Sequence, residues 1–167
     1  MCENMIKNNK IHILLNTDYK EVIDDIDYEK LIYTGPIDYF YDNKFGKLLY
    51  RSLKFVTETH DLDSYQEVAV VNYPNDNDFT RITEFKKLTD QEYPNKTIIM
   101  KEYPGFDDEP CYPYPTEEYK NKFEQYKKLM DEESNVIFIG RLAEYKYYNM
   151  DLVVKSALNA FKNKIKE

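Results

Sequence analysis

Short apolar runs, several of them alternating with polar residues, divide the first two thirds of the chain, a pattern typical of β-strands. The pattern predicts strands at residues 11–15, 31–33, 49–57, 67–73, 79–85 and 96–102, and a short helix behind Pro36 at residues 37–45. Within the strand at 49–57, Arg51 shares a face with Leu53 and Phe55. Short strands joined by polar turns favour an antiparallel sheet.

The pattern changes beyond residue 102. Residues 103–116 contain four prolines, and we expect no regular structure there. A helix is expected from Thr116, its N-cap, to about Glu133. The apolar face of this helix consists of Tyr119, Phe123, Tyr126 and Met130. A buried strand at residues 136–140 and a closing helix from Asp151 to about Lys164 follow.

A strand between two helices needs a parallel sheet to join, and the pattern shows no such sheet for residues 136–139. The strand would then expose an unpaired edge, so we expect marginal stability, self-association or dependence on a partner. The fold class predicted is α+β: an antiparallel sheet of about five to six strands followed by a helix-strand-helix piece of an α/β domain. The predicted divisions are linking strands at 1–32, the antiparallel sheet at 33–115 and the helix-strand-helix piece at 116–167.

Composition narrows the classes of function. The chain has 167 residues, 42% hydrophobic and 32% charged, with a formal net charge of −8. This charge argues against a nucleic-acid partner and against an anionic membrane surface, and no apolar run reaches the roughly 18 residues of a membrane span. Cys2 and Cys111 are too few for a disulfide framework or a zinc site. Since the N-terminus also lacks a signal peptide, a cytoplasmic location is predicted.

Arginine is rare in this chain, since the 23 basic residues include only Arg51, Arg81 and Arg141. A planar guanidinium binds phosphate or carboxylate in a bidentate way that an ammonium does not, so each is a candidate anion ligand. Chance placement explains each of them equally well at this point. The 17 tyrosines offer many phenol donors, although most are expected to serve packing.

The segment at residues 140–151 follows the predicted buried strand and leads into the last helix. Open α/β sheets bind ligands at such turns, at the carboxyl ends of strands and against helix N-termini. Gly140 would let the backbone approach a cofactor. A purely structural turn is the alternative, and strand-glycine-helix does not exclude it.

At this segment a resemblance becomes specific. Residues 140–151, Gly-Arg-Leu-Ala-Glu-Tyr-Lys-Tyr-Tyr-Asn-Met-Asp, resemble the C-terminal hallmark of the UDP-galactopyranose mutases. Other segments resemble the family in the same order: Tyr33-Thr34-Gly35-Pro36-Ile37-Asp38, Tyr50-Arg51-Ser52-Leu53-Lys54-Phe55, Val70-Val71-Asn72-Tyr73, Thr80-Arg81-Ile82, Glu102-Tyr103-Pro104 and Glu109-Pro110-Cys111-Tyr112-Pro113. The resemblance runs from about Ile11 to the C-terminus and matches less than half of a typical member.

The resemblance implies an isomerase that interconverts UDP-galactopyranose and UDP-galactofuranose, a step in galactofuranose biosynthesis for cell walls or surface polysaccharides. Reduced FAD would attack the anomeric carbon through its N5 and expel UDP, and the flavin–sugar adduct would open and reclose through another hydroxyl. Residues 33–115 would belong to the substrate domain. Residues 116–167, together with the strands before residue 33, would belong to the FAD-binding domain.

The resemblance also implies roles for individual residues. Arg81, Tyr112 and Tyr147 match the diphosphate-binding arginine and tyrosines of the family, and Arg51 matches a further active-site arginine. Asn149 stands at a substrate-side position where the family usually has Asp, which removes a charge. The residues implied to border the flavin are Gly140, Arg141, Met150 and Asp151. No metal ligand is implied, and no side chain is assigned as the nucleophile.

The change at Asn149 and three further departures put independent activity in doubt. Ala143 and Phe85 replace a family Gly and His, and no Gly-x-Gly-x-x-Gly occurs among the 167 residues. We therefore expect that the chain does not retain FAD alone. One hypothesis is a mutase portion that binds UDP-galactose or UDP and needs an N-terminal mutase half, or a homo-oligomer, for activity. The alternative is a non-catalytic remnant or a module that binds a UDP-sugar or a protein, and an independent enzyme comes third.

Overall fold

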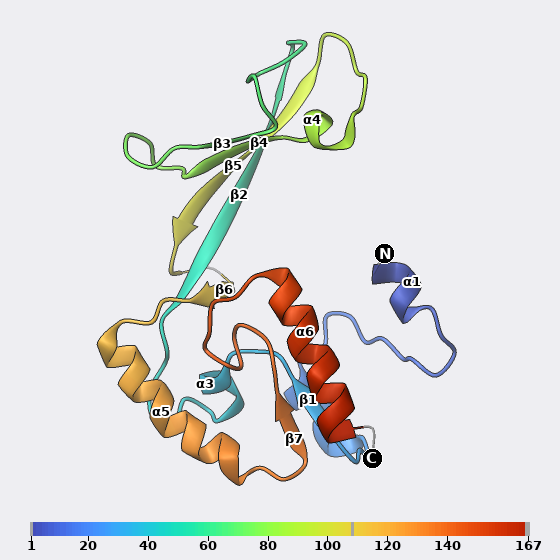
Figure 1. Cartoon of the computed structure of the whole chain (residues 1–167), viewed down its shortest axis with the longest axis vertical. Coiled ribbons are helices and arrows are strands. Elements are labelled where there is room, and N and C mark those ends of the chain that lie inside the picture. The colour runs from blue at the N-terminus through green and yellow to red at the C-terminus, as the bar shows by residue number, and fades with distance from the viewer. Residues whose placement is uncertain (1, 108, 166–167) are drawn as a thin grey trace.

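The computed structural model describes residues 2–107 and 109–165. Its elements form an antiparallel sheet, most of it drawn at the top of Figure 1, above an α/β part that contains most of the helices. The elements in chain order are α1 (Cys2–Ile6), α2 (Tyr19–Val22), a 3-10 turn (Ile23–Asp25), β1 (Leu31–Tyr33), α3 (Ile37–Phe40), β2 (Tyr50–His60), β3 (Val70–Asn72), β4 (Arg81–Glu84), α4 (Phe85–Thr89), β5 (Thr97–Gly105), β6 (Pro110–Pro113), α5 (Glu117–Glu132), β7 (Val136–Phe138), α6 (Met150–Ala160) and a π-turn (Phe161–Ile165).

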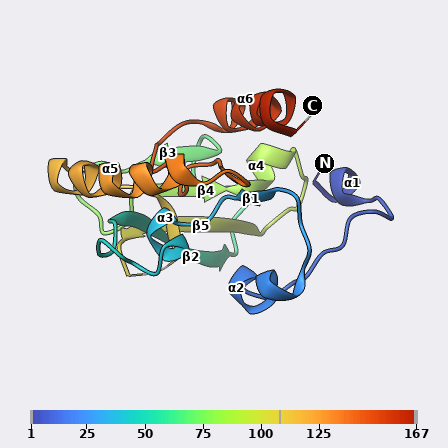
Figure 2. The same ribbon diagram turned by 90° about the horizontal axis from the view of Figure 1, so that it is seen from below.

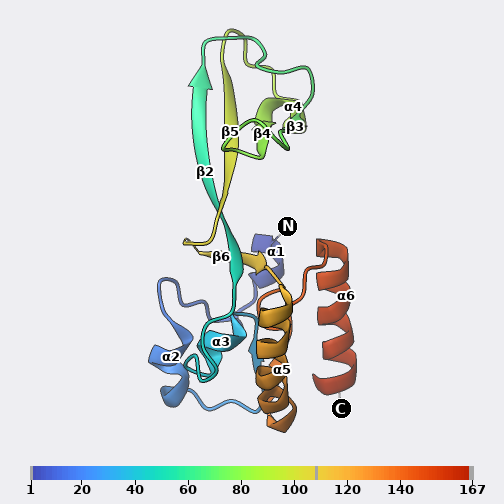
Figure 3. The same cartoon turned by 90° about the vertical axis from the view of Figure 1, so that its left-hand side faces the viewer.

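The antiparallel sheet has five strands in the order β3-β4-β5-β2-β6. Strands β2 and β5 are its long members, paired from Ser52 opposite Gly105 to His60 opposite Thr97. Figure 3 shows these two strands rising from the α/β part, and they connect it to the rest of the sheet. The α+β class and the antiparallel sheet predicted from the alternating pattern are thus confirmed.

The α/β part contains a parallel pair, β1 beside β7, in which Ile32 lies opposite Ile137. The prediction that residues 136–139 have no partner in this sequence was therefore wrong. The missing partner is the short strand at 31–33, whose three residues show no period that distinguishes a parallel from an antiparallel neighbour. Of the three β7 side chains, only Ile137 is buried.

The core lies between α3, α5 and the start of β2. Its buried cluster contains Ile37, Leu48, Tyr50, Tyr126 and Tyr145. The apolar face predicted for α5 is confirmed, because Tyr126 is buried and Tyr119, Phe123 and Met130 pack against the cluster. Thr116 is the N-cap residue as predicted, although its side chain makes no capping hydrogen bond. In contrast, α6 has no buried residue, and Figure 2 shows it on the outside of the molecule.

Two buried carboxylates anchor loops to this framework. Asp38 in α3 accepts hydrogen bonds from the Leu48 backbone N–H at 2.9 Å and the Tyr50 hydroxyl at 3.1 Å. Glu84 at the end of β4 accepts from the Tyr65 and Gln66 backbone N–H groups at 3.0 and 3.1 Å. Buried charges are tolerated where such donors replace water.

Two further expectations were wrong. Residues 11–15 form no strand, and Leu15 is 78% exposed, because these apolar side chains lie along an extended segment that joins neither sheet. Residues 103–116 do contain regular structure, namely the end of β5 and all of β6. Pro110 and Pro113 fit in β6 because it is an edge strand, where a missing N–H breaks no central ladder.

Candidate functional site

One face of the antiparallel sheet carries a row of cross-strand neighbours that the sequence places far apart. Asn72 lies opposite Arg81, and Arg81 lies opposite Glu102. Further along, Leu53 lies opposite Pro104, and Arg51 opposite Tyr112. Directly opposed residues point to the same face of a sheet. The prediction that Arg51 and Leu53 share a face is consistent with this arrangement.

A cavity of about 560 Å³ lies over this face. Its described lining residues are Arg51, Leu53, Thr80, Arg81, Glu102, Pro104, Tyr112, Pro113 and Tyr147. Four of the five side chains predicted to hold the substrate therefore converge on one cavity. Asn149, the fifth, is not among the described lining residues and is the N-cap of α6.

Tyr112 and Tyr147 reach the cavity from different elements. Tyr112 belongs to edge strand β6, in which a register shift between Arg51 and Ser52 leaves Cys111 as an extra residue. Such a bulge re-aims neighbouring side chains. Tyr147 comes from the turn between β7 and α6. The two rings meet edge to face, with centroids 5.5 Å apart and an interplanar angle of 72°.

Arg81 is held along its length by two neighbours. Its Nε donates to Asn72 Oδ1 at 3.0 Å, and its Nη1 lies 3.4 Å from Glu102 Oε1. Glu102 is mostly shielded from water, while nearly half of the Arg81 side chain is exposed. An anion in the cavity would therefore meet the remaining donors of a guanidinium whose direction is already fixed.

Arg141 lies behind Tyr147. Its Nε donates to the Tyr148 carbonyl at 2.7 Å, and its guanidinium carbon lies 5.2 Å from the centre of the Tyr147 ring. The Tyr148 hydroxyl donates to the Glu144 carboxylate, and burial together with this bond raises the pKa of Tyr148 to about 12. Arg141 thus supports the turn that presents Tyr147, and it is not among the described residues that line the cavity.

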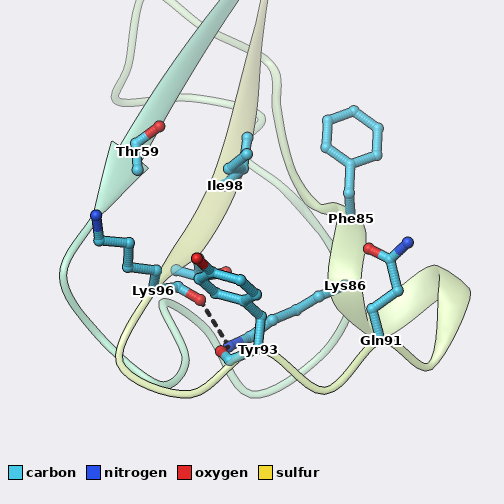
Figure 4. Close-up of a pocket in the computed structure, with 8 residues that line it drawn as sticks. Thr59, Phe85, Lys86, Gln91, Tyr93, Lys96 and Ile98 are labelled. Carbon is cyan, nitrogen blue, oxygen red and sulfur yellow. Dashed lines mark hydrogen bonds between the residues drawn. The ribbon is translucent and has the colours of Figure 1, made fainter.

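A second cavity, of about 350 Å³, lies at the other end of the sheet (Figure 4). Phe85, Tyr93 and Ile98 supply apolar walls, and Lys86 crosses beneath Tyr93 to donate to the carbonyls of Tyr93 and Lys96 at 3.2 and 3.0 Å. No residue predicted for the site belongs to its described lining.

Several lining residues were not predicted as ligands from the sequence. Glu102 and Pro104 lie in a segment that resembles the mutases, and Leu53 in another, yet none was assigned a role. Alternation could have found Leu53, since it shares a strand face with Arg51. Glu102 has no such signal, because its position opposite Arg81 depends on the register of β4 and β5.

The described residues set two boundaries on the chemistry. Among residues 2–107 and 109–165, no cluster of three or more His, Cys, Asp or Glu could hold a metal ion. None of the helices in that part of the chain is long and apolar enough to cross a membrane.

Comparison with known proteins identifies the family. The sequence profile of UDP-galactopyranose mutase matches residues 1–147. The chain belongs to the UDP-galactopyranose mutase family. The motif resemblance had indicated the same family, and the cavity residues lie within the matched range.

The relatives of known sequence include mutases for different sugar nucleotides. The chain is 39% identical over 136 residues to a probable UDP-galactopyranose mutase of Klebsiella pneumoniae, which covers 79% of this chain and 35% of the relative. It is 35% identical over 156 residues to the UDP-galactopyranose mutase of Mycoplasma genitalium, a match that covers 88% of this chain and 39% of the relative. It is 36% identical over 143 residues to a dTDP-fucopyranose mutase of Escherichia coli, a match that covers 83% of this chain and 38% of the relative. The chain thus spans less than two fifths of these relatives.

Mutases of this family are flavoproteins, so the four residues predicted to border FAD require a structural test. Gly140 has φ +96°, a conformation that favours glycine, and it ends the stretch that follows β7. Its N–H already donates to Glu144 at 3.0 Å. Met150 and Asp151 are exposed in the first turn of α6, whose N-cap makes no side-chain bond. The start of α6 fits a flavin, because the backbone N–H groups of its first turn have no side-chain cap and Gly140 lets the backbone come close. The Gly140 N–H itself is already bonded to Glu144.

Replacing Gly140 with alanine is expected to lower the free energy of unfolding by about 1 kcal/mol, because a Cβ strains a backbone with positive φ. The nearest atom to such a Cβ, Thr34 Cβ at 3.7 Å, is in ordinary contact, so crowding adds little. Urea denaturation measures the change. Gly140→Asn is the comparison, since asparagine adopts a positive φ at a lower cost than alanine. Equal losses in both variants would contradict a strain at Gly140.

Proposed function

We propose that this chain forms the diphosphate-binding side of a mutase site that interconverts UDP-galactopyranose and UDP-galactofuranose. The observation that carries the proposal is the convergence of Arg51, Arg81, Tyr112 and Tyr147 on one cavity of about 560 Å³. Two guanidinium forks and two phenols suit a diphosphate, which offers several acceptor oxygens in a small volume. The net charge of −8 makes this local pair of cations necessary for an anionic ligand.

Each residue has a defined part in the proposal. Arg81 donates to the diphosphate while Asn72 and Glu102 fix its direction. The phenols of Tyr112 and Tyr147 donate from the opposite wall, and together these groups stabilise the negative charge that develops on the departing UDP. Reduced flavin, when bound, supplies the nucleophile for the anomeric carbon. Gly140, Arg141 and the start of α6 would border it, and Asn149 stands at the substrate side.

The nucleotide is a finer part of the proposal. One relative is a dTDP-fucopyranose mutase, while the matched family and the other relatives act on UDP-galactopyranose by name. The cavity residues described above bind a diphosphate, which both nucleotides contain. We favour UDP on the family match. Titration with UDP and with dTDP in parallel tests this preference.

The test of binding is calorimetric titration of the 167-residue chain with UDP. The Arg81→Ala variant is expected to raise the Kd at least tenfold, since a charge-assisted contact to a phosphate contributes about 1.5–3 kcal/mol. Lys54→Ala is the control, because Lys54 is an exposed cation of β2 whose direct partner, Tyr103, is not a cavity residue. Equal effects of the two changes would refute a specific diphosphate site at Arg81.

The catalytic part of the proposal has a separate test. The chain is mixed with a separately expressed, flavin-loaded N-terminal portion of the Mycoplasma genitalium relative, and interconversion of UDP-galactose is followed. Turnover that disappears with Arg81→Ala supports the proposal. A stable, flavin-loaded mixture without turnover would leave UDP binding as the function of the chain, and a flat UDP titration would then leave only a non-catalytic remnant. A cytoplasmic location remains a prediction from the sequence.

A further inference from the structure

Arg51 is held differently from the other two arginines. Its guanidinium carbon lies 4.4 Å from the centre of the Phe106 ring and 5.0 Å from that of Tyr114. The two rings contact each other edge to face at 5.4 Å. Among the described residues, the Arg51 side chain has no hydrogen bond or ion pair. Within the described part of the chain, the contacts of this cation are thus with aromatic rings.

Stacking leaves the guanidinium able to bind an anion. A contact with a ring face uses none of the five guanidinium N–H bonds in a conventional hydrogen bond, so these donors stay available to an anion. Arg81, by contrast, has in-plane donors directed at Asn72 and Glu102, and Arg141 has one directed at the Tyr148 carbonyl. Counting only contacts to residues 2–107 and 109–165, Arg51 is thus the cavity cation with the most donors left for a ligand.

The backbone fixes both rings next to Arg51. Phe106 follows the last residue of β5, Gly105, which is paired with Ser52 beside Arg51. Tyr114 donates its N–H to the Leu49 carbonyl at 2.9 Å, and its own carbonyl accepts from the Tyr145 hydroxyl at 3.2 Å. The rings are 44% and 41% exposed, so burial in a core does not account for their position.

We propose that Phe106 and Tyr114 are positioning residues that clamp Arg51 with its N–H edge toward the cavity, so that it binds the diphosphate without further ordering. This proposal rests on the proposed function, because the diphosphate is the ligand there. An unclamped arginine loses rotamer freedom when it binds, and that loss weakens affinity. The aromatic pair removes this cost beforehand.

The experiment measures UDP affinity of the 167-residue chain by calorimetry. Phe106→Leu and Tyr114→Leu are each expected to raise the Kd a few-fold, and the double variant about tenfold, as expected for partly exposed cation–π pairs. Tyr114→Phe and Phe106→Tyr keep a ring face and should keep the wild-type Kd. Tyr93→Leu removes an exposed ring at the other end of the sheet, where it lines the second cavity, and serves as the matched control.

A double-mutant cycle separates positioning from loss of structure. In an Arg51→Ala background the leucine variants should have no further effect on the Kd, since no guanidinium remains to be positioned. Equal effects in both backgrounds would overturn the clamp. If the wild-type chain binds UDP and the leucine variants bind it with the same Kd, the clamp is also overturned. The proposed function would still stand in that case.

An NMR measurement tests the clamp without a ligand. Stacked rings shift the Arg51 side-chain proton resonances upfield, and the leucine variants should move them back toward ordinary values. Unshifted Arg51 resonances in the wild-type chain would contradict the clamp directly. If the shifts are present and the wild-type chain binds no UDP, the proposed function fails, and the binding role of the clamp fails with it.

Discussion

Tyr126→Ala is expected to lower the free energy of unfolding by about 4 kcal/mol, the usual cost of removing a large buried aromatic side chain. Tyr126 is 0% exposed and lies at the centre of the cluster under α5. Its ring contacts the Phe45 ring edge to face, with centroids 5.1 Å apart, and stacks on the Tyr41 ring, with centroids 6.1 Å apart. Truncation would leave a cavity between α5 and the segment after α3, which the helix cannot fill without moving.

The matched control for this prediction is Tyr126→Phe, which keeps the ring and removes the hydroxyl. That hydroxyl donates to the Gly46 carbonyl at 2.9 Å and accepts from the Phe45 N–H at 3.1 Å, so its loss should cost about 1–2 kcal/mol. Urea denaturation followed by circular dichroism measures both variants. Equal losses for alanine and phenylalanine would show that ring packing is not the main contribution.

Glu84→Gln is the second change with a large expected effect, a loss of about 3 kcal/mol at pH 7. Glu84 is 0% exposed, and its carboxylate accepts from Thr97 Oγ1 at 2.6 Å in addition to the Tyr65 and Gln66 N–H groups. Lys87 lies 4.0 Å away. A glutamine keeps the shape, but its amide N–H₂ would face donors, so at least one of these bonds would be lost.

The effect of Glu84 should depend on pH. Burial raises its pKa, but the hydrogen bonds from Thr97, Tyr65 and Gln66 outweigh burial, and the pKa lies below its usual value. A depressed pKa in the folded state stabilises the fold above the unfolded pKa of about 4.3, and the contribution is lost as pH falls through the folded value. The wild-type chain and Glu84→Gln should therefore converge in stability in acid. A difference between them that stays constant from pH 7 to pH 3 would contradict this account.

Periodicity predicted the elements whose packing is local. The α5 face with Tyr126 follows a helical period, and β2 follows an alternating one, so each was found from sequence alone. The parallel pairing of Leu31–Tyr33 with β7 was not, because three residues carry no periodic signal and the partner lies far along the chain. Residues 11–15 show the opposite error, since an apolar run predicts burial only where a sheet edge is available.

The candidate site was predictable through residue type and family motif rather than through geometry. Arg81, Tyr112 and Tyr147 were singled out in this way, and the cavity brings them together with Arg51. The groups that orient them were missed. Glu102 owes its place to strand register, and Phe106 lies in a proline-rich segment that predicted no structure. The neighbours that give Glu102 and Phe106 their roles lie far from them in sequence, so no local pattern predicts these roles.

The parallel pairing of β1 with β7 also bears on the order of folding. Near this pair, Lys30 Nζ donates to the Ser134 carbonyl across 104 positions of the chain. The whole antiparallel sheet lies between the two strands in sequence, so closing them as a free loop would carry a large entropic cost. Once β2 and β5 have paired, the same ends are held near each other and the effective loop is short. We therefore expect the sheet that presents the cavity to form first and to bring the two strands of the α/β part together.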